Sequence, residues 1–199
     1  MDLKRSYTLI APLYDLLVAA PLAGARKRSL ARLPQHGALD VFINGIGTGL
    51  DLPLPPPTHR YVGLDLTRAM LERVQPRRGG LDLATVQGDS QRLPFRNNSF
   101  DIALLHLILA IVPDPVATLR ETARVLKPGG RVLVLDKFLR VGQAAPLRRA
   151  FSPWVARIAT RLDVVFEEVL AAAGELELVS DERALARGWF RSIELRKRA

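Results

Sequence analysis

Short apolar runs alternate with amphipathic stretches along this chain, and the alternation predicts strands and helices in turn. Apolar residues recur at helical spacing on one face of residues 7–18, and a second helix is expected from about Leu22 to Leu33. Three short apolar runs that indicate strands follow at 39–43, 61–65 and 81–86. Turn residues separate each run from the next.

The second half of the chain continues this alternation. Phe100 to Ile108 is apolar enough for a strand covered on both faces, as in parallel sheets. Asp114-Pro115 predicts a helix start, and Pro128-Gly129-Gly130 predicts the end of that helix. The remaining expected elements are a helix capped by Thr67, a strand over 131–138, helices over 145–160 and 163–173, the latter capped by Asp163, and strands over 176–179 and 189–195.

Because strands and helices alternate throughout, we predict an α/β fold with a mostly parallel sheet of about seven strands. A chain of 199 residues can bury one full core, and the Pro-rich stretch 53–57 is too short to separate two. We therefore expect a single domain over residues 1–199. The chain has no cysteine, which excludes disulfides, cysteine-bound zinc and thiol nucleophiles, and we expect no metal.

The charge balance of 29 basic and 20 acidic residues gives a net charge of +9. Such an excess is typical of proteins that bind nucleic acid or anionic membranes, and equally of an arginine-rich background composition. Only 6% of residues are aromatic and no stacking platform is evident, so we expect no nucleic-acid partner. The apolar stretch 9–20 contains Pro12 and Asp15 and is too short to span a bilayer. We expect a cytoplasmic protein, either free or peripheral at the inner membrane surface.

Three polar signals follow successive predicted strands. Gly45-x-Gly47-x-Gly49 lets the backbone turn tightly and approach a ligand closely, although a simple turn explains such a loop as well. Asp65 ends the next strand, where a carboxylate accepts both ribose hydroxyls of a nucleoside. Asp89, in a Gly-Asp-Ser turn, can accept a hydrogen bond from an adenine amino group. A helix cap and a plain turn are the alternatives for the two aspartates, and the specificity lies in the order of all three signals.

In this order, the motifs resemble class I S-adenosylmethionine (SAM)-dependent methyltransferases of the ubiquinone/menaquinone-biosynthesis type, over roughly residues 7–138. The segments that carry the resemblance are 41–49, "YVGLDLTRAML" at 61–71, "GDSQRLPFRNNSFD" at 88–101 and "VLKPGGRVLVLD" at 125–136. The resemblance implies a Rossmann-like fold and a SAM site. The implied cofactor residues are Asn44, Gly45, Ile46, Gly47, Thr48, Gly49, Asp65, Leu66, Met70, Asp89, Ser90 and His106.

One position departs from the family pattern. The family usually has Asp or Glu two residues before the first loop glycine, where this chain has Ile43. Asn44 is one substitute, as a neutral acceptor, and Asp51 is another, reaching in from beyond the loop. If neither substitutes, SAM binding is weakened or the chain is an inactive SAM-binding partner protein.

A narrower resemblance, to bacterial phospholipid N-methyltransferases that convert phosphatidylethanolamine towards phosphatidylcholine, rests on three segments. They are Tyr7-x-x-x-Ala11-Pro12-x-Tyr14-Asp15, Gly47-Thr48-Gly49-Leu50, and "IVPDPVATLRE" at 111–121. This resemblance implies a lipid amine as methyl acceptor. The alternatives are a quinone precursor or another small acceptor and, given the charge, a nucleic acid.

His106, Tyr14 and Tyr7 are the candidate catalytic residues. His106 lies near the carboxyl end of a strand, where a neutral imidazole can take a proton from the acceptor or simply line the SAM pocket. The two tyrosines either cover SAM or pack in a helix core. Residues 1–35 are expected to form a substrate lid or a membrane-contact element. Its expected exposed face carries Arg26, Lys27, Arg28 and Arg32.

Overall fold

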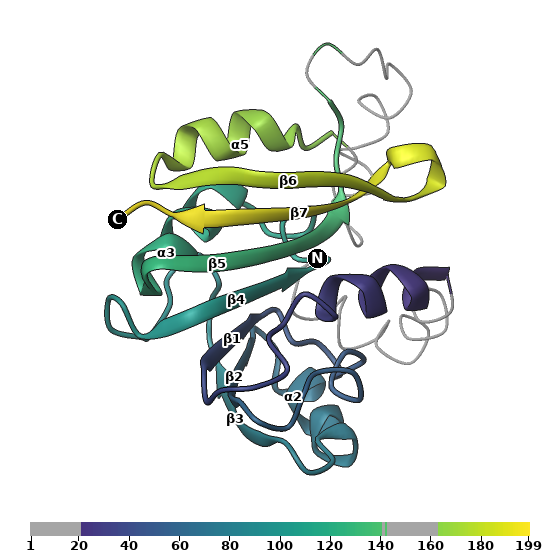
Figure 1. Cartoon of the computed structure of the whole chain (residues 1–199), viewed down its shortest axis with the longest axis vertical. Coiled ribbons are helices and arrows are strands. Elements are labelled where there is room, and N and C mark those ends of the chain that lie inside the picture. The colour runs from purple at the N-terminus through teal and green to yellow at the C-terminus, as the bar shows by residue number, and fades with distance from the viewer. Residues whose placement is uncertain (1–20, 141, 143–162) are drawn as a thin grey trace.

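The computed structural model describes residues 21–140, 142 and 163–199 of the chain. Its centre is one seven-stranded sheet in the order β3-β2-β1-β4-β5-β7-β6 (Figure 1). The strands are β1 (Asp40–Asn44), β2 (Arg60–Asp65), β3 (Asp82–Gln87), β4 (Phe100–His106), β5 (Leu126–Lys137), β6 (Leu176–Leu185) and β7 (Phe190–Lys197). All pairings are parallel except those of β7, which runs antiparallel to both β5 and β6. The predicted α/β fold with a mostly parallel sheet is confirmed.

Helices cover both faces of this sheet. They are α2 (Arg68–Val74), α3 (Pro115–Val125), α5 (Phe166–Ala173), the short 3-10 turns η1 (Gln75–Arg77) and η2 (Ala186–Gly188), and a helical segment over residues 21–30. Alternation along β1 shows the two faces, because Phe42 packs with α3 and α5 whereas Val41 and Ile43 pack with Leu30 and Val74 on the other side. None of the helices in the described ranges is long and apolar enough to cross a bilayer.

The sheet changes its winding direction between β1 and β4. From β1 the chain moves outward to β2 and β3, and it then returns to place β4 on the other side of β1. Ligands of open α/β sheets bind beyond the carboxyl ends of the strands at such a switch point. This topology therefore marks the edge of the sheet where the glycine loop 45–49 and His106 lie.

The predicted position of α2 after Thr67 is confirmed, whereas the predicted bounds of α5, β5 and β6 are wrong, β6 extending to Leu185 rather than to 179. Thr67 occupies the N-cap position of α2, but its hydroxyl donates to Asp65 Oδ1 and makes no cap hydrogen bond. Helix α5 begins at Phe166 rather than at 163, because Val165 forms a β-bridge with Leu139 and holds the chain extended. Strand β5 already begins at Leu126, which pairs with Phe100, so the Pro-Gly-Gly segment 128–130 lies within β5 at a register shift.

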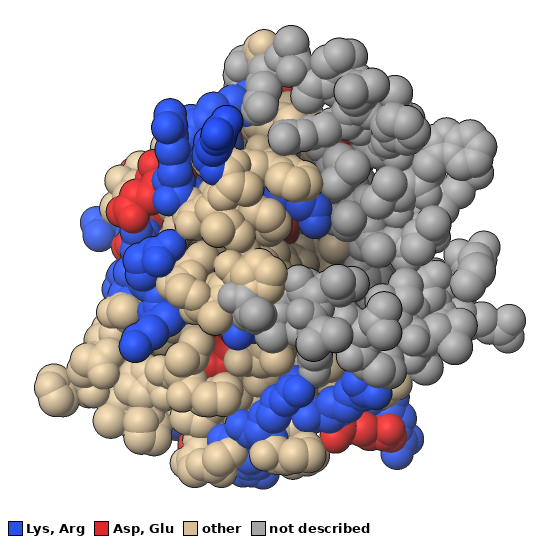
Figure 2. Space-filling view, turned by 90° about the vertical axis from the view of Figure 1, so that its right-hand side faces the viewer, with Lys and Arg blue, Asp and Glu red and all other residues tan. Residues whose placement is uncertain are grey.

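The predicted exposed basic face of the second helix is confirmed for Lys27 and Arg28 but is wrong for Arg26, and Arg32 is only partly exposed. Arg26 is only 8% exposed, and Arg32 forms ion pairs with Glu182 (2.6 Å) and Glu194 (3.7 Å). Lys27 and Arg28 face outward, and Arg28 donates to the carbonyl of Ala184. Figure 2 shows the lysines and arginines of one face of the molecule in several separate groups, with uncharged surface between them.

Candidate active site

A cavity of about 780 Å³ opens beyond the carboxyl ends of β1, β2 and β4. Most of the predicted cofactor residues line it: Gly45, Ile46, Gly47, Thr48, Asp65, Leu66, Met70, Asp89, Ser90 and His106. Asn44 and Gly49 do not line it. The predicted catalytic residues Tyr7 and Tyr14 lie outside the described residues, as do the expected helices over 7–18 and 145–160.

Asp65 joins the glycine loop to the start of α2. Its Oδ2 accepts from the backbone N–H of Gly47 at 3.0 Å, and its Oδ1 accepts from the backbone N–H of Thr67 at 2.9 Å and from the Thr67 hydroxyl at 3.2 Å. Burial raises the pKa of Asp65, and these hydrogen bonds offset only part of that effect. The carboxylate lies at the cavity wall, the position that a ribose-binding residue requires.

The glycine loop needs the backbone conformations that it has. Gly45 has a φ of +76°, and a Cβ there would come within 2.7 Å of Ile108 Cδ1. Gly47 has a φ of +55° and faces open space, so the backbone is accessible to a ligand. Arg77 supports the loop from η1 by donating from Nη1 to the carbonyl of Thr48 (3.1 Å) and to its hydroxyl (2.7 Å).

Asp89 and Ser90, which follow β3, also line the cavity. Asp89 Oδ1 accepts from the backbone N–H of Gln91 (2.9 Å) and from its side-chain amide (3.1 Å), so the carboxylate closes a turn as well as lining the cavity. Ser90 donates to Asn44 Oδ1 at 2.6 Å, and Asn44 Nδ2 donates to Thr122 Oγ1 at 3.3 Å. Asn44 is thus fully buried and ties β1 to this loop and to α3, and its assignment as a SAM contact stays a prediction.

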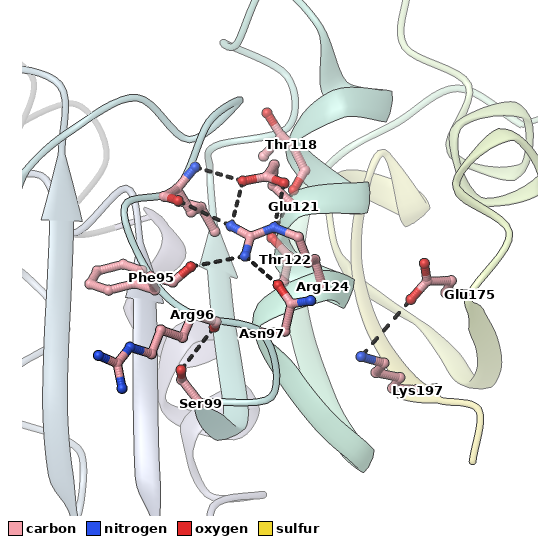
Figure 3. A network of polar contacts seen from close by, with 11 residues as sticks. Phe95, Arg96, Asn97, Ser99, Thr118, Glu121, Thr122, Arg124, Glu175 and Lys197 are labelled. Atoms are coloured by element: carbon pink, nitrogen blue, oxygen red, sulfur yellow. Dashed lines mark hydrogen bonds and ion pairs between the residues drawn. The ribbon is translucent and has the colours of Figure 1, made fainter.

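The remainder of this loop, up to β4, is fixed to α3 by Arg124 (Figure 3). Arg124 donates to the carbonyls of Leu93 (3.0 Å) and Phe95 (2.9 Å) and to Asn97 Oδ1 (2.8 Å). Glu121 pairs with two nitrogens of the same guanidinium and accepts from the backbone N–H of Leu93. Through one side chain and two backbone carbonyls of the segment 88–101, Arg124 therefore anchors to α3 the loop that carries Asp89.

The cavity is also lined by Arg26, from the helical segment 21–30, and by Asp51, two residues after the glycine loop. Arg26 and Ser29 lie one helical turn apart on the segment 21–30, and both are buried. His106 Nε2 lies 3.0 Å from Ser29 Oγ, and His106 Nδ1 lies 2.7 Å from Asp51 Oδ2. Arg26 Nε lies 3.4 Å from the other oxygen of Asp51.

Both ring nitrogens of His106 are therefore engaged. If the ring is neutral, Nδ1 donates to the Asp51 carboxylate and Nε2 accepts from the Ser29 hydroxyl. Two roles are considered for His106, taking a proton from the acceptor and lining the pocket. This arrangement matches the second without further change, and it also lets His106 orient Asp51. Removal of a proton from an acceptor would first require the bond to Ser29 to break.

Sequence reasoning missed Arg26 as a pocket residue, although a signal exists. Leu22, Ala25, Arg26 and Ser29 follow the spacing of a covered helical stripe, and the first two pack on the sheet. A charged residue within such a stripe points into the protein rather than to solvent. The segment 107–113, which supplies Leu107, Ile108, Ile111, Val112 and Pro113 to the cavity, was also not assigned to it.

Replacing Arg77 with Ala is expected to weaken SAM binding about tenfold, because the carbonyl and hydroxyl of Thr48 lose a charged donor worth about 1.5 kcal/mol or more. Isothermal titration with SAM measures this change. Arg78, the exposed neighbour in sequence, provides the matched control Arg78→Ala. Equal affinities in the two variants would show that Arg77 does not support the loop.

The residues of the cavity fit SAM. The lining offers the Asp65 carboxylate for a ribose, the apolar side chains of Leu66 and Met70 for an adenine ring, and the Asp89 carboxylate for an adenine amino group. Arg26 Nε and Asp51 Oδ1 are buried polar atoms without a hydrogen-bond partner in the described structure, which suits a charged ligand. When bound, SAM supplies a methyl group activated by its sulfonium, so positioning and exclusion of water dominate what the protein must do.

Comparisons with known proteins agree with this arrangement. The family model described as a methyltransferase domain matches residues 39–134. The chain is 28% identical over 200 residues to phosphatidylethanolamine N-methyltransferase of Cereibacter sphaeroides, covering 98% of this chain and 97% of that one. It is 40% identical over 81 residues to demethylmenaquinone methyltransferase of Staphylococcus aureus, covering 40% of this chain and 34% of that one.

A solved structure shares the fold across nearly the whole chain. It is the methyltransferase in a complex with the Haloferax volcanii Trm112 methyltransferase activator, with a TM-score of 0.79, 20% identity, and coverage of 97% of this chain and 98% of that one. At this identity the likeness concerns the fold alone. Together with the domain match over 39–134 and the relatives above, the strand order and the cavity identify this protein as a SAM-dependent methyltransferase with S-adenosylmethionine as its methyl donor.

Proposed function

We propose that the methyl acceptor is the amine of phosphatidylethanolamine, which the enzyme methylates towards phosphatidylcholine. The observation that carries this proposal is the end-to-end similarity to the phosphatidylethanolamine N-methyltransferase of Cereibacter sphaeroides, over 98% of this chain. The similarity to demethylmenaquinone methyltransferase spans only 81 residues. Methyltransferases that share a methyl donor share its binding motifs, so similarity beyond those motifs is the better indicator of the acceptor.

The charge of the second helix does not carry the proposal. Arg26 lines the cavity and Arg32 is paired with two glutamates, so two of the four basic residues considered for membrane contact serve the fold or the pocket. Contact of residues 1–35 with an anionic membrane remains a separate prediction. If the enzyme acts on a lipid, the acceptor is reached at a bilayer surface, and a peripheral association is part of the proposal.

The chemistry of the acceptor sets one requirement. A protonated amine has no lone pair for attack on the methyl group, so phosphatidylethanolamine must lose a proton first. His106 makes two hydrogen bonds within the pocket, and we assign it to orienting Asp51 rather than to taking that proton. Tyr7 and Tyr14 remain candidates for contact with the amine.

The test is transfer of labelled methyl groups from SAM to lipid vesicles by the full chain. We expect label in the headgroup of vesicles that contain phosphatidylethanolamine and none in vesicles of phosphatidylglycerol alone. Mass analysis of the lipids reports how many methyl groups are added. A parallel incubation with demethylmenaquinone tests the second candidate, a quinone acceptor, which the 40% identity over 81 residues favours. Label in the quinone but not in the lipid would overturn the proposal.

A further inference from the structure

Two buried atoms of opposite charge face each other on the cavity wall. Arg26 Nε and Asp51 Oδ1 lie 3.4 Å apart, and neither has a hydrogen-bond partner in the described structure. The Arg26 side chain is 9% exposed and that of Asp51 is 16% exposed. The two atoms attract each other as an ion pair, but buried polar atoms are nearly always hydrogen-bonded as well, so two that lack a hydrogen bond at a cavity indicate a ligand with both a donor and an acceptor.

The surroundings of Asp51 favour its ionised form, because they lower its pKa. Burial by itself would raise the pKa of Asp51, but His106, through charge and a hydrogen bond, and Arg26, through charge, together hold it below the usual value. His106 donates to Oδ2 at 2.7 Å and is itself fixed by Ser29 at 3.0 Å. These contacts leave Oδ1 as the oxygen available for a ligand.

Ile43 and Asn44 are the two other residues near the position where the family has its acidic residue, and neither offers a free acceptor to the cavity. Ile43, at the position where the resembling family has an acidic residue, packs in the hydrophobic core with Leu30 and Val74. The side-chain amide of Asn44 is hydrogen-bonded to Ser90 and Thr122, and Asn44 does not line the cavity. Asp65 already binds the glycine loop through Gly47, so the cavity carboxylate left for this role next to the loop in sequence is that of Asp51, two residues after Gly49.

We propose that Asp51 and Arg26 together bind the amino-acid end of SAM, Asp51 accepting from its α-ammonium group and Arg26 donating to its α-carboxylate. This pair replaces the acidic residue that is absent at position 43, and it depends on the identification of SAM as the methyl donor. The ligand end is a zwitterion with its two charges on one carbon, and the pocket offers the two complementary charges side by side. His106 and Ser29 act as positioning residues for Asp51.

The pocket separates the two ends of the ligand. Asp65, at the end of β2, is assigned to the ribose and Asp89 to the adenine side, whereas Arg26 lies on the helical segment 21–30 and Asp51, after the glycine loop, is paired with it. A ligand without an amino-acid end therefore contacts Asp65 and Asp89 only. This separation makes the proposal testable with ligands that lack one group at a time.

The experiment is isothermal titration of the full chain with SAM, decarboxylated SAM and 5′-methylthioadenosine, without an acceptor. Decarboxylated SAM lacks the carboxylate, and 5′-methylthioadenosine lacks the whole amino-acid end. For Asp51→Asn we expect affinity for SAM and for decarboxylated SAM to fall about 30-fold, with 5′-methylthioadenosine changed less than twofold. For Arg26→Gln we expect a similar loss for SAM and little change for the other two ligands.

Asp89→Asn, a carboxylate of the lining that is assigned to the adenine side, is the matched control and should weaken all three ligands alike. Thermal unfolding of each variant identifies losses due to misfolding, because these would also affect 5′-methylthioadenosine. If Asp51→Asn binds SAM as the wild type does, or loses SAM and 5′-methylthioadenosine equally, the proposed subsite is wrong. No acceptor is present, so the result is independent of whether the enzyme methylates phosphatidylethanolamine.

Discussion

Replacing Asp65 with Asn is expected to reduce the affinity for SAM at least about 100-fold. The carboxylate accepts from Gly47, from the Thr67 backbone and from the Thr67 hydroxyl, and an amide has only one oxygen to serve these donors. Its NH₂ group would face an N–H donor, so the glycine loop and the start of α2 lose their common anchor together with the ribose acceptor. Each lost charge-assisted hydrogen bond costs about 1.5–3 kcal/mol, which in combination gives this magnitude.

Isothermal titration with SAM measures the loss, and Asp82→Asn, an exposed aspartate at the start of the neighbouring strand β3, serves as the control. Thermal unfolding should show that Asp65→Asn remains folded. A variant that binds SAM within threefold of the wild type would contradict the assignment of Asp65 to the ribose.

The pH dependence of SAM binding provides an independent check on Asp65. Burial raises its folded pKa above the ordinary value of 3.8, whereas the pKa of Asp51 is lowered despite burial, through His106 and Arg26. On acidification Asp65 therefore gains a proton before Asp51 does, and SAM affinity should begin to fall above the pH at which an ordinary aspartate titrates. The sign for stability is opposite. The folded ligand-free state binds this proton more tightly than the unfolded state, so the Asp65 contribution to stability decreases as pH rises through this window.

The pocket residues that sequence reasoning located are those tied to strand ends. The glycine loop follows β1, Asp65 ends β2, Asp89 follows β3 and His106 ends β4, and parallel strands bring all four positions to one edge of the sheet. Strand identity and order along the chain are therefore enough to assemble this part of the site. The SAM assignment of Asp65 rests on this logic and not on any single motif.

The residues that it missed depend on contacts between distant segments. Arg26 lies on the helical stripe that packs on Leu135 through Leu22 and Ala25, and although the spacing marks such a stripe, it does not show which distant strand covers it. The side chain of Thr67 would cap α2 in isolation, but the Asp65 carboxylate takes its hydroxyl as a donor. Likewise, Asp163 has the right residue type for a helix cap, yet pairing of the adjacent Val165 with Leu139 moves the start of α5.

The largest expected effect on stability comes from Arg191, whose side chain is 1% exposed. Its guanidinium donates to both carboxylate oxygens of Asp181 (3.0 and 2.6 Å) and to Glu167 (2.8 Å), and it lies over the rings of Phe138 and Phe166. It thereby connects β7 to β6 and to α5. Replacing Arg191 with Met fills a similar volume but takes the closest cation away from the half-buried Asp181 carboxylate, which keeps, among the described residues, only Arg140 at 3.8 Å, and this change costs about 3 kcal/mol. For a chain of this length the melting temperature should fall by about 10 °C.

Thermal and urea unfolding measure this change. The matched control is Arg183→Met, because Arg183 is exposed and lies directly across from Arg191 in the register of β6 and β7. The double variant with Asp181→Asn should recover part of the loss, since the stranded charge is then removed.

The hydrogen bonds of Arg191 lower the pKa of Asp181 below 3.8, so this pair contributes stability above that pH and loses it as pH falls through the lowered pKa. The gap between wild type and Arg191→Met should therefore narrow in acid. A gap that is equal to that of the Arg183 control, or independent of pH, would show that the ion pair does not stabilise the fold.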